Sequence, residues 1–186
     1  MNERRDKFIR YLLKLEADEE RATLATLRRG LGEPPGTVLA LGRYVYPFFG
    51  SEELETPYGR RESEAFFLIA TLFALHPQNV SSGNMGAHLR ELKREKEQKG
   101  EKDDATERRF AQLLATHPND LHEVLPRILS LLKAKDEKIN WRQLLDEVYD
   151  WRFEKPQKAW ARSFWHKAAR ITDLETESNP TTPEGE

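Results

Sequence analysis

The chain has no cysteine, which excludes disulfide bonds, thiolate metal ligands and a cysteine nucleophile. It also lacks any apolar run of the roughly 20 residues that a membrane-spanning helix needs. The N-terminal residues 1–7 contain no apolar segment of the kind found in signal peptides. We therefore expect a cytoplasmic protein with no membrane partner.

Patterns that would indicate catalysis or a cofactor are missing as well. The five histidines show no i, i+4 pairing and no His-Glu-x-x-His arrangement, and the chain has no P-loop. Paired acidic residues such as Asp103 and Asp104 fall in expected loops, where solvent would keep them from acid–base work. We expect no metal, no cofactor and no catalytic site, and hence a protein that is not an enzyme.

The net charge of −2 conceals an uneven distribution. From Ile171 onward the tail has five acidic residues and no basic one; without these five, 27 carboxylates face 30 Lys and Arg, a net charge of +3. We predict a disordered acidic tail over 171–186. The preceding segment 151–170 is strongly basic and also contains three of the four Trp residues.

Apolar residues recur at helical spacing along most of the chain and no strand alternation appears, which predicts an all-α fold. We expect an irregular bundle of roughly eight to nine helices. The expected segments are 7–15, 18–31, 38–49, 64–76, 84–99, one starting near 106, one after 118–120, 141–151 and 156–170. Residues 50–59 are expected to form a polar loop.

The segment 64–76 is apolar on almost every face and predicts the central core helix. The turn 81–86 follows it, where Gly83 permits positive φ and Asn84 suits a helix N-cap. A structural turn is favoured here over an anion site at the helix N-terminus. We expect one helical domain over 1–170, with a division into subdomains 1–80 and 81–170.

Two arginine pairs stand out. Arg28 and Arg29 end an expected helix, where cations complement the macrodipole, so a structural role is as well supported as a functional one. Arg108 and Arg109 lie near a helix start, where the macrodipole disfavours cations. This placement favours either a phosphate ligand or an ion pair to a neighbouring helix.

The four Trp residues are better explained by core packing than by base stacking. If Trp160 and Phe164, spaced i, i+4, face the core, the interleaved basic residues point outward and form a stripe suited to nucleic-acid backbone. The residues of this stripe are Arg152, Lys155, Lys158 and Arg162. Without the help of a family, these residues are also consistent with a second function, a helical protein–protein scaffold whose arginines form interface salt bridges. A transcription regulator is not favoured, because the sequence shows no helix-turn-helix pattern.

A set of short segments, in order, resembles the small subunit (CasB family) of the type I-E CRISPR Cascade surveillance complex. The matching segments are LATLRRG (24–30), YVYPF (44–48), ATLFALHP (70–77), SGNMG (82–86), ERRFAQLL (107–114), LPRILSLLK (125–133), INW (139–141) and WARSFW (160–165). Each segment is weakly specific, but their order and spacing make the set strong. Met85 stands where Leu is commoner, and the acidic tail lies outside the match.

The resemblance implies a non-catalytic subunit that contacts other Cascade subunits, a second copy of itself, CRISPR RNA and the target and displaced DNA strands. It implies basic surfaces that help to hold the R-loop open, while guide pairing supplies sequence specificity. The basic positions in or directly beside matching segments are Arg28, Arg29, Arg43, Arg108, Arg109 and Arg127. The stripe from Arg152 to Arg162 aligns more loosely with the family.

Overall fold

The computed structural model describes residues 3–100 and 104–166. Helices dominate this part of the chain, and its only β contact is an isolated parallel bridge between Asn79 and Ile139. The α-helices are α1 (Glu3–Ala17), α2 (Arg21–Leu27), α3 (Gly42–Val45), α4 (Ser51–Leu54), α5 (Pro57–Leu75), α6 (Met85–Gln98), α7 (Asp104–Leu114), α8 (Leu121–Lys133), α9 (Trp141–Tyr149) and α10 (Lys155–Trp165). Five 3₁₀ turns, η1 to η5, connect some of them. The all-α fold predicted from the sequence is confirmed.

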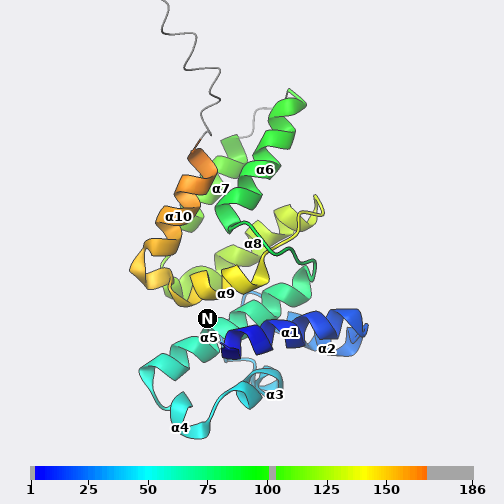
Figure 1. Cartoon of the computed structure of the whole chain (residues 1–186), viewed down its shortest axis with the longest axis vertical. Coiled ribbons are helices and arrows are strands. Elements are labelled where there is room, and N and C mark those ends of the chain that lie inside the picture. Colours follow the sequence, from blue (N-terminus) through cyan, green and yellow to red (C-terminus); the bar gives the residue numbers. More distant parts are fainter. Residues whose placement is uncertain (1–2, 101–103, 167–186) are drawn as a thin grey trace, which may run out of the picture.

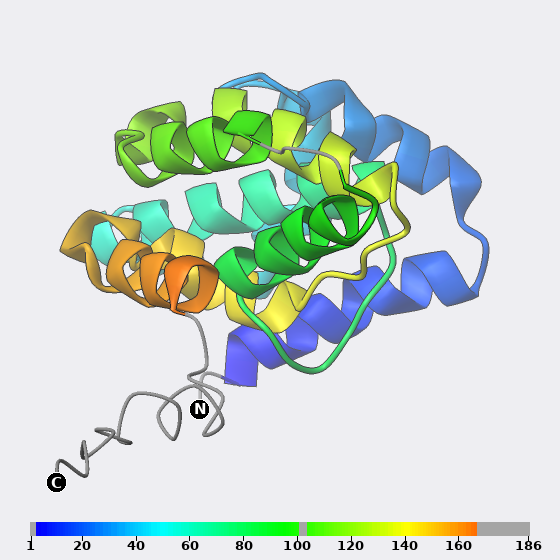
Figure 2. The ribbon, with the colours of Figure 1, turned by 90° about the horizontal axis from the view of Figure 1, so that it is seen from above.

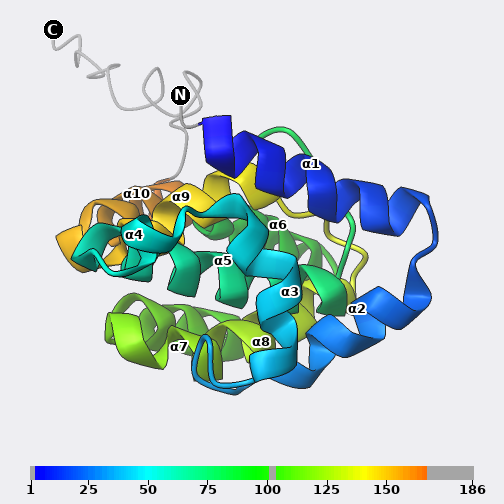
Figure 3. The ribbon, with the colours of Figure 1, turned by 90° about the horizontal axis from the view of Figure 1, so that it is seen from below.

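Helix α5 is the centre of the molecule, as its apolar sequence predicted. Every residue from Ala65 to Ala74 is buried. Seen from below, α5 lies between α1 and α9 on one side and α8 on the other (Figure 3). Such enclosure explains why residues 65–74 of this helix have no polar face. Its residues contact helices from both halves of the sequence.

Helices α6, α7 and α10 form the end of the molecule farthest from α3 and α4 (Figure 1). Viewed from above, α6 lies beside α10 (Figure 2), and Gly86 allows the two to approach closely. A Cβ at Gly86 would lie 2.1 Å from the carbonyl oxygen of Trp160. Asn84 caps α6 by accepting from the Ala87 N–H at 3.0 Å, and its amide donates to Ser163 at 2.9 Å. The turn 81–86 is thus explained by packing, as expected.

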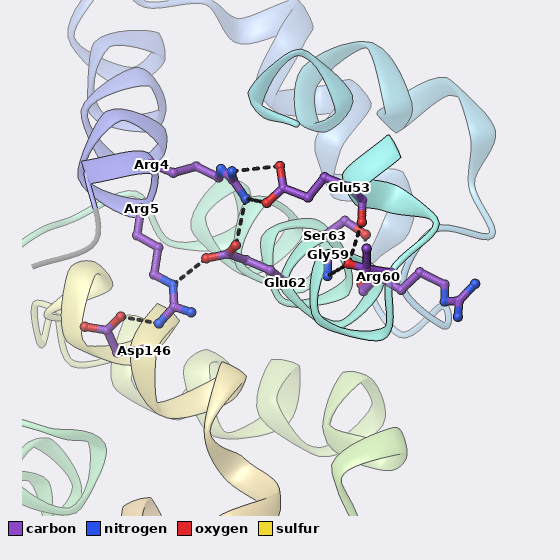
Figure 4. A network of polar contacts seen from close by, with 9 residues as sticks. Arg4, Arg5, Glu53, Gly59, Arg60, Glu62, Ser63 and Asp146 are labelled. Carbon is purple, nitrogen blue, oxygen red and sulfur yellow. Dashed lines mark hydrogen bonds and ion pairs between the residues drawn. The ribbon is translucent and has the colours of Figure 1, made fainter. Parts of the chain in front are cut away.

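Charged side chains fasten α1 to the rest of the bundle (Figure 4). Arg5 and Glu62, each 8% exposed, pair at 2.8 Å between α1 and α5. Arg5 also reaches Asp146 on α9 at 2.6 Å, and Arg4 bridges Glu62 and Glu53. Through its two carboxylate partners, Arg5 therefore joins three helices that are far apart in sequence.

Three sequence predictions about helix boundaries were wrong. Residues 38–49 form three short turns instead of one helix, since Pro47 has no N–H to donate. The expected loop 50–59 contains α4 and the first turn of α5, which Thr56 caps by accepting from the Gly59 N–H at 3.0 Å. Helix α10 ends at Trp165, and His166 has extended backbone.

Part of the predicted last helix and the acidic tail, residues 167–186, lie outside the described residues. Among the residues that are described, no helix has the length and apolarity to cross a membrane.

Candidate nucleic-acid interface

All ten basic residues singled out from the sequence are at least partly exposed. They occupy six elements: η1 (Arg28 and Arg29), α3 (Arg43), α7 (Arg108 and Arg109), α8 (Arg127), η5 (Arg152) and α10 (Lys155, Lys158 and Arg162). They therefore form several separate groups instead of one continuous patch.

Arg108 and Arg109 are free because their neighbour Glu107 takes the structural contacts. Glu107 accepts from Lys93 of α6 at 2.5 Å and from the Trp165 indole N–H of α10 at 3.0 Å. These two hydrogen bonds hold the pKa of the Glu107 carboxyl below its usual range, and the one from Lys93 has the larger effect. Glu107 thus ties α7 to two neighbours, while the two arginines that follow it face solvent.

The basic stripe of α10 lies on the solvent side of that helix. Lys155, Lys158 and Arg162 recur at spacings of three and four, so they share one side. The opposite side carries Trp160 and Phe164, which are 0% and 5% exposed. Core packing was thus the right interpretation for Trp160, as it was for Trp141 and Trp151, whereas Trp165 is 45% exposed.

Several of the ten residues already have partners. Arg28 donates from Nε to the carbonyl of Ala74 at 2.7 Å, at the C-terminal end of α5, where a cation is favoured. Arg43 donates to the Ala40 carbonyl, and Lys158 pairs with exposed Glu154 at 3.1 Å. These contacts give Arg28 a clear structural role.

The remaining free cations are those best placed to bind phosphate. Within residues 3–100 and 104–166, seven of the ten make no side-chain hydrogen bond or ion pair: Arg29, Arg108, Arg109, Arg127, Arg152, Lys155 and Arg162. An exposed guanidinium without a carboxylate partner is free to form charge-assisted hydrogen bonds to a phosphate. The arrangement suits backbone contact without base readout.

Sequence reasoning missed one feature, a cavity lined by Arg60, Arg61, Tyr149 and Arg152. Its wall comes from four separate segments of the chain, so no local sequence pattern predicts it. Across the described ranges no three His, Asp or Glu side chains are grouped as a metal site would require.

Comparison with known proteins agrees with this architecture. A Cse2-family protein from Thermus thermophilus has a TM-score of 0.71 at 25% identity, covering 87% of this chain and 97% of its own. CasB from M. ruber has a TM-score of 0.69 at 27% identity, covering 95% and 98%. A chain in a structure described as a CRISPR RNA-guided surveillance complex matches in fold, with a TM-score of 0.68 at 24% identity, covering 95% and 98%.

These matches define a class of small, all-helical CRISPR-associated proteins, and the fold places this chain among them. The sequence model described as CRISPR-associated protein Cse2 (CRISPR_cse2) matches residues 23–165. The chain therefore belongs to the CRISPR-associated Cse2 family, as the resemblance in its sequence predicted. No curated protein matches it in a sequence search.

Proposed function

We propose that this protein is the non-catalytic small subunit of a type I-E Cascade complex and stabilises the R-loop through contacts with nucleic-acid backbone. Membership of the Cse2 family and the fold shared with a chain of a CRISPR RNA-guided surveillance complex support this assignment. Its partners would be other Cascade subunits, a second copy of itself, CRISPR RNA and the DNA strands, in the cytoplasm.

The observation that carries the proposal is the set of exposed cations without partners, above all Arg108 and Arg109. Heteroduplex formation is nearly balanced energetically, so a few phosphate contacts suffice to shift it. Guide pairing supplies the sequence information, and backbone contacts need no base readout. The net charge of −2 agrees with a subunit whose basic groups act after assembly, beside those of its neighbours.

The test replaces both arginines by glutamate, Arg108→Glu with Arg109→Glu, in the assembled complex. We expect target-DNA binding to weaken at least about tenfold and its log–log salt slope to become shallower by about two. The matched control, Arg10→Glu with Lys14→Glu, makes the same charge change on exposed positions of α1. Binding and salt slope equal to those of the control would refute the assignment of these two residues.

A protein–protein scaffold is the second candidate function. Exposed apolar side chains favour it, since Leu39 and Tyr58 are 84% and 70% exposed. In that case, omission of the protein would change complex assembly, while the salt dependence of DNA binding would stay the same. A DNA-binding salt series with and without the protein therefore separates the two functions.

A further inference from the structure

A cavity of about 730 Å³ lies where four segments meet. Its lining comes from residues 34–35, the N-terminal half of α5, residues 117–119 with 121–122, and the end of α9 with η5. Arg108, Arg109 and Arg127 do not line it, so it is a site apart from the exposed cations on α7 and α8. Its volume falls in the range of about 300–1,000 Å³ that is typical of small-molecule sites.

Arg61 lines this cavity and has unused hydrogen-bonding capacity. Its Nε and Nη1 atoms are buried and have no hydrogen-bond partner among the described residues. Its guanidinium stacks over the Tyr149 ring, 4.2 Å from the centroid, with Tyr58 and Phe153 further out. The aromatic contacts fix the guanidinium but leave these two nitrogens without an acceptor, and a buried unsatisfied donor is costly.

Arg61 differs from nearby Arg5, whose positive charge is neutralised by carboxylates. Arg5 lies over the same Tyr149 ring at 3.9 Å, but it pairs with Glu62 and Asp146. Arg60 and Arg152 also line the cavity. The Arg60 side chain points away from the ion pairs of the neighbouring network (Figure 4).

Glu64 is the one acidic residue among the described residues of the lining. Burial raises the pKa of its carboxyl, and the charge of Arg60 lowers it in part. Three arginines and a single carboxyl thus line the cavity. This imbalance favours an anionic occupant.

The lining of the cavity indicates an occupant that has an apolar part as well as a negative charge. Four prolines, with Ala65, Leu68 and Val148, supply apolar surface in addition to the arginines. Asn119 and Glu64 add hydrogen-bonding groups to that surface. We propose that this cavity binds a nucleoside phosphate, with the phosphate on Arg61, Arg60 and Arg152 and the base against the proline-rich wall. The occupant is either a free nucleotide or one nucleotide of a single strand.

The test is isothermal titration calorimetry of the full chain at about 50 mM salt. The probes are adenosine 5′-monophosphate, adenosine and inorganic phosphate. We expect the monophosphate to bind with a dissociation constant below about 1 mM, and adenosine and phosphate at least about tenfold more weakly. Arg61→Met keeps a side chain over Tyr149 but removes the charge, so it should weaken monophosphate binding at least about tenfold.

Two variants guard against a folding effect. Arg60→Met changes an exposed residue of the lining and should weaken the monophosphate several-fold with an unchanged melting temperature. Arg10→Met on α1, outside the lining, should bind like the native protein. No saturable binding of the monophosphate, or binding that Arg61→Met and Arg60→Met both leave unchanged, would overturn the proposal.

A competition with an eight-nucleotide single-stranded DNA identifies the source of the nucleotide. Displacement of the monophosphate assigns the site to a strand, and the absence of displacement assigns it to a free nucleotide. This inference does not rest on the proposed function. It concerns the isolated chain and Arg61, whereas the R-loop experiment concerns the assembled complex and Arg108 with Arg109, so either can fail alone.

Discussion

Replacement of Glu147 by glutamine should stabilise the protein, and the gain should grow with pH. Glu147 lies on α9, where its Oε1 accepts from Gln143 at 2.8 Å and its Oε2 is buried without a hydrogen bond. Burial raises the pKa of this carboxyl from 4.5 to about 7; Gln143 and the Trp160 N–H lower it in part, and the charge of Asp146 raises it.

The sign and size of the effect follow from proton linkage. The unfolded carboxyl ionises near pH 4.5, whereas the folded one ionises only near pH 7. The native protein therefore loses stability as pH rises between these values, and the loss levels off above pH 7. A shift of about 2.5 units at 1.36 kcal/mol each gives a loss of about 3 kcal/mol. Glutamine cannot ionise and avoids this loss.

Urea unfolding, followed by circular dichroism between pH 5 and pH 8, measures the effect. We expect the stability of Glu147→Gln relative to the native protein to rise by about 2.5 kcal/mol over this range. A constant offset between the two proteins is irrelevant, because the change with pH carries the argument. Glu52→Gln, at an exposed position on α4, should show no such trend. A stability difference for Glu147→Gln that stays flat with pH would refute the reasoning.

Three further predictions concern packing and the tail. Arg5→Met removes one of the two arginines that pair with buried Glu62 and should cost about 1.5–3 kcal/mol in urea unfolding, with Arg10→Met near neutral as the control. Gly86→Ala places a methyl group against the Trp160 carbonyl and should cost about 1–3 kcal/mol or more, whereas a Cβ at Gly50 meets no atom within 4 Å and Gly50→Ala should stay within about 0.5 kcal/mol. Equal melting temperatures for these two glycine variants would contradict the close approach of α6 and α10. Removal of residues 172–186, which lie outside the described residues, should change neither the melting temperature nor assembly; a clear loss of either would assign the tail a structural role.

The sequence predicted best the features that depend on neighbouring residues. Asn84 as a helix cap and the outward face of α10 follow from local spacing, and both are found in the structure. The start of α5 was missed because Tyr58 to Ser63 are mostly polar and hide the helical pattern, although Thr56 and Pro57 carry the cap signal. The short turns of 39–48 follow from Pro47 and from packing on α5, which spacing alone does not predict.

The candidate site was predicted in part. The sequence identified basic residues that the structure finds exposed, but it offered no means to separate Arg28, which binds a helix end, from Arg29, which has no partner among the described residues. The Ala74 carbonyl that Arg28 contacts is 46 positions away in sequence. The cavity around Arg61 was out of reach for the same reason, since it needs four distant segments. The division into subdomains 1–80 and 81–170 stays a prediction.

The segment between α5 and α6 contains the turn at which the sequence predicts a division into two subdomains. In the structure this segment forms hydrogen bonds with the loop before α9. Val80 donates to the Ile139 carbonyl at 3.0 Å, Ile139 donates to Gln78 at 3.3 Å, and the Trp141 indole donates to Gln78 at 2.9 Å. His76 adds a contact at 2.7 Å to the Glu137 carbonyl. Neither segment can detach without releasing the other, so their amides should exchange with solvent as one cooperative unit.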